Sequence, residues 1–177
     1  MAYPHQPVLV QEVVRDLITA MDGIYVDGTV GNGGHSKAIG EKTRPKGRLI
    51  CLDRDPEAVR LSRERLSPLG ERVTVLKGNY AELTEVLQGL GIEKVHGIFL
   101  DLGISSYQLE RSGRGFSFNR DEPLDMRMDQ DDELTAQHLI NTRSPEALEK
   151  ILREYGEEKR ARKIVKTIDR ERRKGPI

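Results

Sequence analysis

The chain has 177 residues, of which 33% are charged and 36% are hydrophobic, and its formal net charge is zero. This length and composition are typical of a soluble globular protein of one domain, or of one domain with part of a second, and they exclude a disordered chain. The zero net charge excludes a polycation, and no apolar run reaches the roughly 20 residues that a membrane-spanning helix needs.

The first hundred residues alternate between helical and strand patterns. Apolar residues recur at helical spacing from Val10 to Leu17, and Asp55 followed by Pro56 is a typical helix start. In chain order, we predict a helix at 10–17, a strand at 23–27, a helix from near Ser36, a strand at 48–53, a helix at 56–66, a strand at 73–76, a helix at 83–90 and a strand at 95–101. Because these strands are mostly apolar rather than alternating, they indicate a parallel sheet covered on both faces. The pattern therefore predicts an α/β fold with a doubly wound, Rossmann-like sheet.

The pattern changes after the fourth predicted strand. Residues 102–133 are rich in Gly, Ser, Arg and Asp and have no clear period, and a loop of this length is usually functional or disordered. The chain becomes helical again from Leu134, with a helix start at Ser144 and another helix after Gly156. We therefore predict two domains, residues 1–108 and residues 109–177.

A glycine-rich loop, DGTVGNGGH, follows the first predicted strand at residues 27–35. Its glycines, Gly28, Gly31, Gly33 and Gly34, can adopt positive φ and let the backbone approach a ligand closely. The N-terminus of the next helix offers free N–H groups to a carboxylate or a phosphate. Because ordinary turns also use glycine, the loop alone leaves a turn and a cofactor loop equally open.

An acid, Asp53, ends the second predicted strand about 20 residues beyond the loop, where dinucleotide-binding folds place an acid on the ribose hydroxyls. The alternative role of Asp53, a helix cap, is already filled by Asp55. Together, the loop and the acid predict a cofactor that contains a nucleoside.

Two cofactors fit this prediction, NAD and S-adenosylmethionine. Gly31 and Gly33 match the first two glycines of the dinucleotide pattern, but Ser36 stands at the third, and no Walker lysine follows. Asp27, directly before the loop, can interact with a ligand amine or fix the loop. An acid at this place favours the cationic cofactor, S-adenosylmethionine, over the pyrophosphate of NAD.

The chain contains further motifs, which are His5–Leu9 (HQPVL), Val26–His35, Asp53–Pro56 (DRDP), Asp101–Ser106 (DLGISS) with Gln108, Arg114–Phe118 (RGFSF), Pro123–Met128 (PLDMRM) and Tyr155–Glu158 (YGEE). With these motifs, the chain resembles the MraW/RsmH family. The resemblance implies the fold of a Rossmann-like class I methyltransferase that methylates the N4 amine of a cytosine in the 16S RNA of the small ribosomal subunit.

The resemblance also implies a set of site residues. It implies loop contacts to S-adenosylmethionine from Gly33, Gly34 and His35, a ribose contact from Asp53, an adenine neighbour in Tyr80, where the family usually has Phe, and further cofactor contacts from Asp101 and Gln108. As the acceptor for an N–H of the target amine, Asp101 is the candidate catalytic residue. The alternative is that Asp101 only positions the cofactor.

Family members are longer, and the resemblance implies that they complete the sheet after a helical insertion. The chain then contains an incomplete parallel sheet and part of the insertion. A fragment that binds the cofactor without catalysis is therefore an alternative function, and an NAD-dependent oxidoreductase is a second.

The loop at 102–133 leaves its own alternatives open. Its arginines and phenylalanines could contact RNA phosphates and stack on bases, or its arginines could form salt bridges with interleaved aspartates. The residues concerned are Arg111, Arg114, Arg120 and Arg127, Phe116 and Phe118, and Asp121, Asp125 and Asp129.

A single cysteine, Cys51, cannot form an internal disulfide, which favours a reducing compartment. The N-terminus shows no secretion signal, and the four histidines show no metal-ligand spacing. We therefore predict a cytoplasmic protein that binds no structural metal and no membrane.

Overall fold

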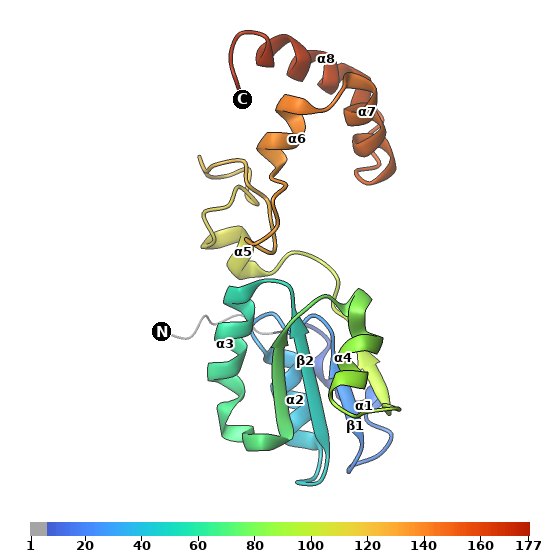
Figure 1. Cartoon of the computed structure of the whole chain (residues 1–177). Helices are drawn as coiled ribbons and strands as arrows, with labels where there is room; N and C mark the ends of the chain where they lie inside the picture. The colour runs from blue at the N-terminus through green and yellow to red at the C-terminus, as the bar shows by residue number, and fades with distance from the viewer. Residues whose placement is uncertain (1–6) are drawn as a thin grey trace. The chain divides into compact units, whose positions relative to one another are not determined.

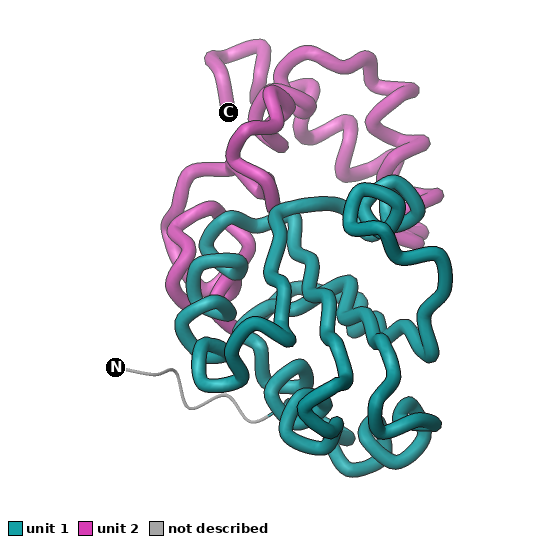
Figure 2. Tube along the Cα trace, turned by 60° about the horizontal axis from the view of Figure 1, so that its bottom comes forward, with its two compact units in different colours: residues 1–105 teal, residues 106–177 magenta. Residues whose placement is uncertain are grey.

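The computed structural model describes residues 7–177, so the motif that starts at His5 lies partly outside the described residues. The chain divides into two compact units, residues 1–105 and residues 106–177 (Figure 2). The division falls three residues before the boundary predicted after residue 108, which assigns Gln108 to the second unit.

The first unit is built on a four-stranded parallel sheet. Its strands lie in the order β3-β2-β1-β4, which confirms the predicted doubly wound, Rossmann-like arrangement. The strands are β1 (Ile24–Asp27), β2 (Arg48–Asp53), β3 (Val73–Lys77) and β4 (Gly97–Phe99). The strand β4 is shorter than the predicted 95–101, because its neighbour β1 ends at Asp27, opposite Phe99.

Four helices connect and cover these strands. They are α1 (Val10–Leu17), α2 (Gly34–Lys42), α3 (Pro56–Leu66) and α4 (Leu83–Gly89), with short 3-10 turns η1 (Ser67–Arg72) and η2 (Tyr80–Glu82). The cap of α3 is as predicted, since the Asp55 carboxylate accepts a hydrogen bond from Glu57 N at 3.0 Å. The helix α2 starts two residues before Ser36, because Gly33 takes a left-handed conformation directly before it.

The core lies on both faces of the sheet. On one face, Tyr25, Leu49 and Cys51 are buried together with residues of α1 and α2, and on the other, Val26 and Ile50 pack with residues of α4. Figure 1 shows α4 in front of the strands and α2 behind them. Full burial of each large apolar side chain stabilises the fold by about 1.5–3 kcal/mol, so this sheet supplies the rigid frame of the unit.

The second unit contains four helices. They are α5 (Ser106–Glu110), α6 (Ala136–Thr142), α7 (Pro145–Glu154) and α8 (Ala161–Arg172). The Ser144 hydroxyl caps α7 by accepting from Ala147 N at 3.2 Å, as the Ser-Pro start predicts. The prediction of no regular structure across 102–133 is wrong at α5, which is too short to show a helical period.

None of the helices among residues 7–177 has both the length and the apolar character needed to cross a membrane.

Candidate cofactor site at the carboxyl end of the sheet

The carboxyl end of β1 is the switch point of the sheet. The strand β1 lies between β2 and β4, and the chain runs outward from it in both directions. In open α/β sheets, ligands bind outside the carboxyl ends of the strands at such a point. The glycine loop, residues 28–33, starts here and leads into α2.

Hydrogen bonds to both neighbouring strands hold the glycine loop. Gly28 N donates to Phe99 O at the end of β4 (3.0 Å), and Val30 N donates to Leu52 O in β2 (2.8 Å). Gly31 N donates to the Asp53 carboxylate at 2.8 Å. The loop therefore has a fixed shape that depends on the ends of three strands.

Two glycines at the start of α2 have specific reasons to be glycine. Gly33 has φ 74°, a left-handed conformation that a side chain strains. A Cβ at Gly34 would lie 2.7 Å from Pro7 Cγ. Within residues 7–177, no side chain caps α2, so the N–H groups of its first turn have no side-chain acceptor there.

Asp27 is buried and fixes the loop. Its carboxylate accepts from Thr29 N at 3.1 Å and from the Ser36 hydroxyl at 2.6 Å, and Cys51 Sγ lies 3.1 Å from that hydroxyl. The side chain points into the protein. Of the two predicted roles of Asp27, contact with a ligand amine and fixing the loop, the structure therefore shows the second. Asp27 therefore does not favour a cationic cofactor, contrary to the prediction from the sequence.

Burial also changes the proton affinity of Asp27. Because desolvation disfavours the charged carboxylate, the pKa of Asp27 rises to about 6, despite the hydrogen bonds from Ser36 and Thr29. Ser36 stands where the dinucleotide pattern has its third glycine, and its hydroxyl stabilises this buried acid. The departure from the dinucleotide pattern thus has a structural role.

Asp53 lies at the end of β2 beside the loop. Its two carboxylate oxygens accept from Gly31 N (2.8 Å) and from Asp55 N (3.0 Å). Partial burial raises the pKa of Asp53. Each oxygen has a second lone pair, so the carboxylate can still accept from a ligand hydroxyl.

His35 and Asp101 form a pair on the β4 side of the loop. His35 Nε2 lies 2.8 Å from Val8 O, and because a carbonyl only accepts, Nε2 carries a hydrogen. Nδ1 of the same ring faces Asp101 Oδ2 at 3.9 Å, and the ring packs against Phe99 with centroids 4.7 Å apart. The Asp101 side chain is 57% exposed, so a ligand can reach it.

The other two predicted site residues, Tyr80 and Gln108, belong to different units. Tyr80 in η2 is 42% exposed and adjoins the loop, because a Cβ at Gly28 would lie 3.1 Å from Tyr80 Cβ. Gln108 lies on α5 in the second unit, where its side chain is buried. The place of Gln108 in the cofactor site therefore stays a prediction.

Comparison with known proteins assigns the family. The model of the MraW methylase family matches residues 2–177. The chain belongs to this family. The ribosomal RNA small subunit methyltransferase H of Lachnospira eligens is 48% identical over 177 residues, which are 100% of this chain and 56% of that protein. The protein of the same name from Caldicellulosiruptor bescii is 50% identical over 175 residues, 99% of this chain and 57% of that protein.

The chain thus spans about half the length of the curated relatives that it matches. Among solved structures, an O-methyltransferase from Bacillus cereus in complex with SAH is 20% identical, with a TM-score of 0.46 over 56% of this chain and 47% of that one. The assignment to the family rests on the sequence matches, and the fold on the strand order above.

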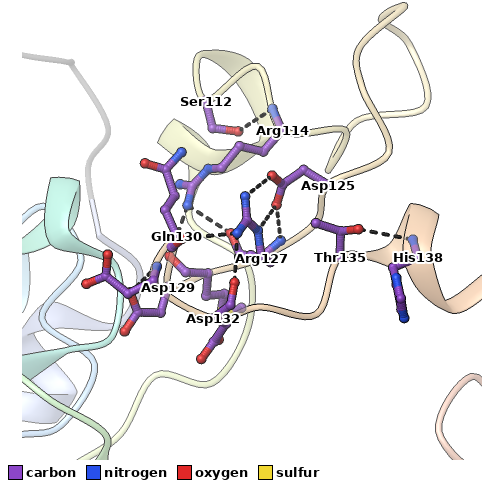
Figure 3. A network of polar contacts seen from close by, with 11 residues as sticks. Ser112, Arg114, Asp125, Arg127, Asp129, Gln130, Asp132, Thr135 and His138 are labelled. Atoms are coloured by element: carbon purple, nitrogen blue, oxygen red, sulfur yellow. Dashed lines mark hydrogen bonds and ion pairs between the residues drawn. The ribbon is translucent and has the colours of Figure 1, made fainter.

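Two arginines of the loop at 111–133, the arginine loop, have structural roles (Figure 3). Arg114 is buried and donates to the carbonyls of Arg127 and Met128 at 2.9 and 3.0 Å. Arg127 binds both oxygens of Asp125, at 2.9 and 2.6 Å, which lowers the pKa of Asp125. For Arg127, the salt-bridged alternative is therefore the one observed, and Arg114 holds the loop through backbone carbonyls.

Other residues of the arginine loop remain on its surface. Arg111 and Arg120 are exposed, and the Phe118 side chain is 98% exposed. Phe116 instead packs under the Arg114 guanidinium, whose central carbon lies 5.4 Å from the centroid of the Phe116 ring.

Sequence reasoning missed one residue of the site. Thr29 Oγ1 accepts a hydrogen bond from Asp101 N at 2.7 Å, across 72 residues of chain. The signal available in the sequence was the position of Thr29 between the acid and the glycines of the loop.

Proposed function

We propose that this chain binds S-adenosylmethionine at the carboxyl end of its sheet and takes part in methylating the N4 amine of a cytosine in 16S ribosomal RNA. The observation that carries the proposal is the pair formed by His35 Nδ1 and the Asp101 carboxylate, 3.9 Å apart beside the first turn of α2. The family, and the relatives named as methyltransferases of small-subunit ribosomal RNA, support the substrate class.

The pair suits the methionine end of this cofactor. With a hydrogen on Nε2, a neutral His35 ring presents a lone pair at Nδ1, so both partners can accept hydrogen bonds from an α-ammonium group. The N–H groups of the first turn of α2, from Gly34 onward, can bind the α-carboxylate. The charges of the two ligand groups are thus complementary to adjacent parts of the site.

The nucleoside end fits the other side of the loop. Asp53 keeps free lone pairs for the ribose hydroxyls, and Tyr80 offers an exposed ring to the adenine. Gly33 and Gly34 allow a close approach of the backbone. The pyrophosphate of NAD has no cationic group to pair with Asp101, which disfavours the oxidoreductase alternative.

Catalysis requires alignment of the target amine with the methyl group. S-adenosylmethionine supplies an electrophilic methyl group bound to a sulfonium. Asp101 is exposed enough to accept an N–H of the amine, which is the proposed catalytic role. The pairing of Asp101 with His35 favours the alternative, in which Asp101 only positions the cofactor.

The proposed substrate sets further conditions. The target base has to leave its stack to reach the methyl group, which is easier in single-stranded RNA. We propose the small ribosomal subunit as the partner and the cytoplasm, where that subunit is found, as the location.

Calorimetric titration of the chain with S-adenosylmethionine and with NADH tests the proposal. We expect binding of S-adenosylmethionine only, and binding of NADH alone would overturn the proposal. Asp101→Asn should weaken the binding of S-adenosylmethionine about tenfold or more, because it removes the charged acceptor. Asp22→Asn, an exposed acid before the amino end of β1, is the matched control and should leave the affinity unchanged.

The transfer itself is tested with labelled S-adenosylmethionine and small ribosomal subunits that lack the modification. Label at N4 of a cytosine in 16S RNA supports the full activity. Tight cofactor binding without transfer supports the non-catalytic fragment instead.

A further inference from the structure

Thr29 connects the buried acid of the glycine loop with Asp101. Its backbone N–H donates to Asp27 Oδ1 at 3.1 Å, and its side-chain Oγ1 accepts from Asp101 N at 2.7 Å. One end of this connection lies in the core, because Asp27 is 1% exposed and also binds the Ser36 hydroxyl. The other end is the residue that faces His35.

The sheet itself does not reach Asp101. The pairing of β1 with β4 ends at Asp27 and Phe99, and Gly28 N–Phe99 O is the next hydrogen bond outward. Two residues later, Asp101 N bonds to a side chain instead of a strand carbonyl. The Thr29 hydroxyl thus extends the contact between the two strands beyond their backbone pairing.

The residues around this contact show why it matters. Leu100 and Leu102, on either side of Asp101, are 41% and 65% exposed, so the packing of their side chains holds this stretch of chain only in part. Thr29 is β-branched, and its side chain is therefore restricted at χ1. A stiff side chain on an anchored loop can hold an otherwise exposed segment in place.

We propose that Thr29 is a positioning residue: its hydroxyl holds the Asp101 backbone, and so places the Asp101 carboxylate opposite His35 for the α-ammonium of the cofactor. This inference rests on the proposed function of the site. It predicts that loss of the hydroxyl weakens binding at the methionine end of the ligand and leaves binding at the nucleoside end unchanged.

Two substitutions in the full chain test this role. Thr29→Val keeps the shape but removes the acceptor, and Thr29→Ser keeps the acceptor. By calorimetry, we expect Thr29→Val to weaken the binding of S-adenosylmethionine about tenfold. The affinity of Thr29→Ser should stay within about threefold of that of the original chain. Thermal unfolding followed by circular dichroism shows that each variant is folded.

A second ligand separates positioning from a general structural effect. Methylthioadenosine has the nucleoside and the sulfur but neither the ammonium nor the carboxylate. Its affinity should be the same for the original chain and for Thr29→Val. In addition, Asp101→Asn should weaken the binding of S-adenosylmethionine less in the Thr29→Val chain than in the original chain. The reason is that the two residues act through one contact.

The outcomes are distinguishable. If the original chain does not bind S-adenosylmethionine, the proposed function fails. If it binds and Thr29→Val binds equally well, only the role of Thr29 is overturned. Equal weakening of both ligands would also overturn the positioning role, since it would indicate a general distortion of the loop.

Discussion

The glycine loop and the arginine loop both lack a helical or strand period, but they are held in different ways. The first is rich in glycine, and the second is rich in arginine and aspartate. The glycine loop is anchored by the ends of β2 and β4 and by a buried acid, Asp27. The arginine loop is anchored by its own guanidinium groups, which donate to carbonyls and carboxylates within the loop. The glycine loop thus uses the sheet of its own unit, whereas the arginine loop uses its own charged groups.

The largest expected difference between the two loops is in their dependence on pH. The pKa of Asp27 is about 6 in the folded chain, above the 3.8 of the free group. Its contribution to stability is therefore fully present below pH 4 and is lost as the pH rises through 6. The shift corresponds to a loss on the order of 3 kcal/mol.

Denaturant unfolding of the original chain and of Asp27→Asn from pH 4 to pH 7 checks this. The free energy of unfolding of the original should fall relative to the variant over that range. If the free energies of unfolding of the two proteins changed in parallel with pH, the prediction would be contradicted. By contrast, the pKa of Asp125 is lowered, so its contribution is lost only as the pH falls below the usual carboxylate range.

A second test removes the anchor of the arginine loop. Arg114→Met should leave the carbonyls of Arg127 and Met128 without their donor, at a cost of about 2 kcal/mol. Hydrogen exchange of the Met126 and Gln137 amides, which are bonded within this region, measures the effect. Arg120→Met, at an exposed arginine of the same loop, is the control, and equal effects of the two would refute the anchoring role.

A third test concerns backbone strain in the arginine loop. Gly113 and Gly115 both have positive φ, 67° and 76°. A Cβ at Gly115 would overlap the carbonyl oxygen of Pro123, whereas Gly113 has open space. Gly113→Ala should cost about 1 kcal/mol and Gly115→Ala at least about 1 kcal/mol more. The same hydrogen exchange measurement should rank them in that order, and the reverse order would contradict it.

The smallest effect is expected at the surface of the arginine loop. Phe118 is 98% exposed, so Phe118→Ser should change the stability by less than about 0.5 kcal/mol. A larger loss in thermal unfolding would show that the phenyl ring supports the loop.

The sequence predicted the frame of the first unit correctly. The apolar segments correspond to β1, β2 and β3 within a residue or so, and Asp55 with Pro56 marked the start of α3. These features depend on neighbouring residues, on periodicity and on caps, which are local properties. The motifs, likewise local, predicted the family.

Only the tertiary structure decided how the site is assembled. The parallel register places Asp27 opposite Cys51 and Phe99, so the acid points into the core instead of toward a ligand. The bond from Asp101 to Thr29 crosses 72 residues, and the partners of Arg114 are carbonyls, which every residue carries. Such pairings cannot be predicted from residue types and spacing, because the pairings depend on strand register and on backbone atoms that the fold brings together.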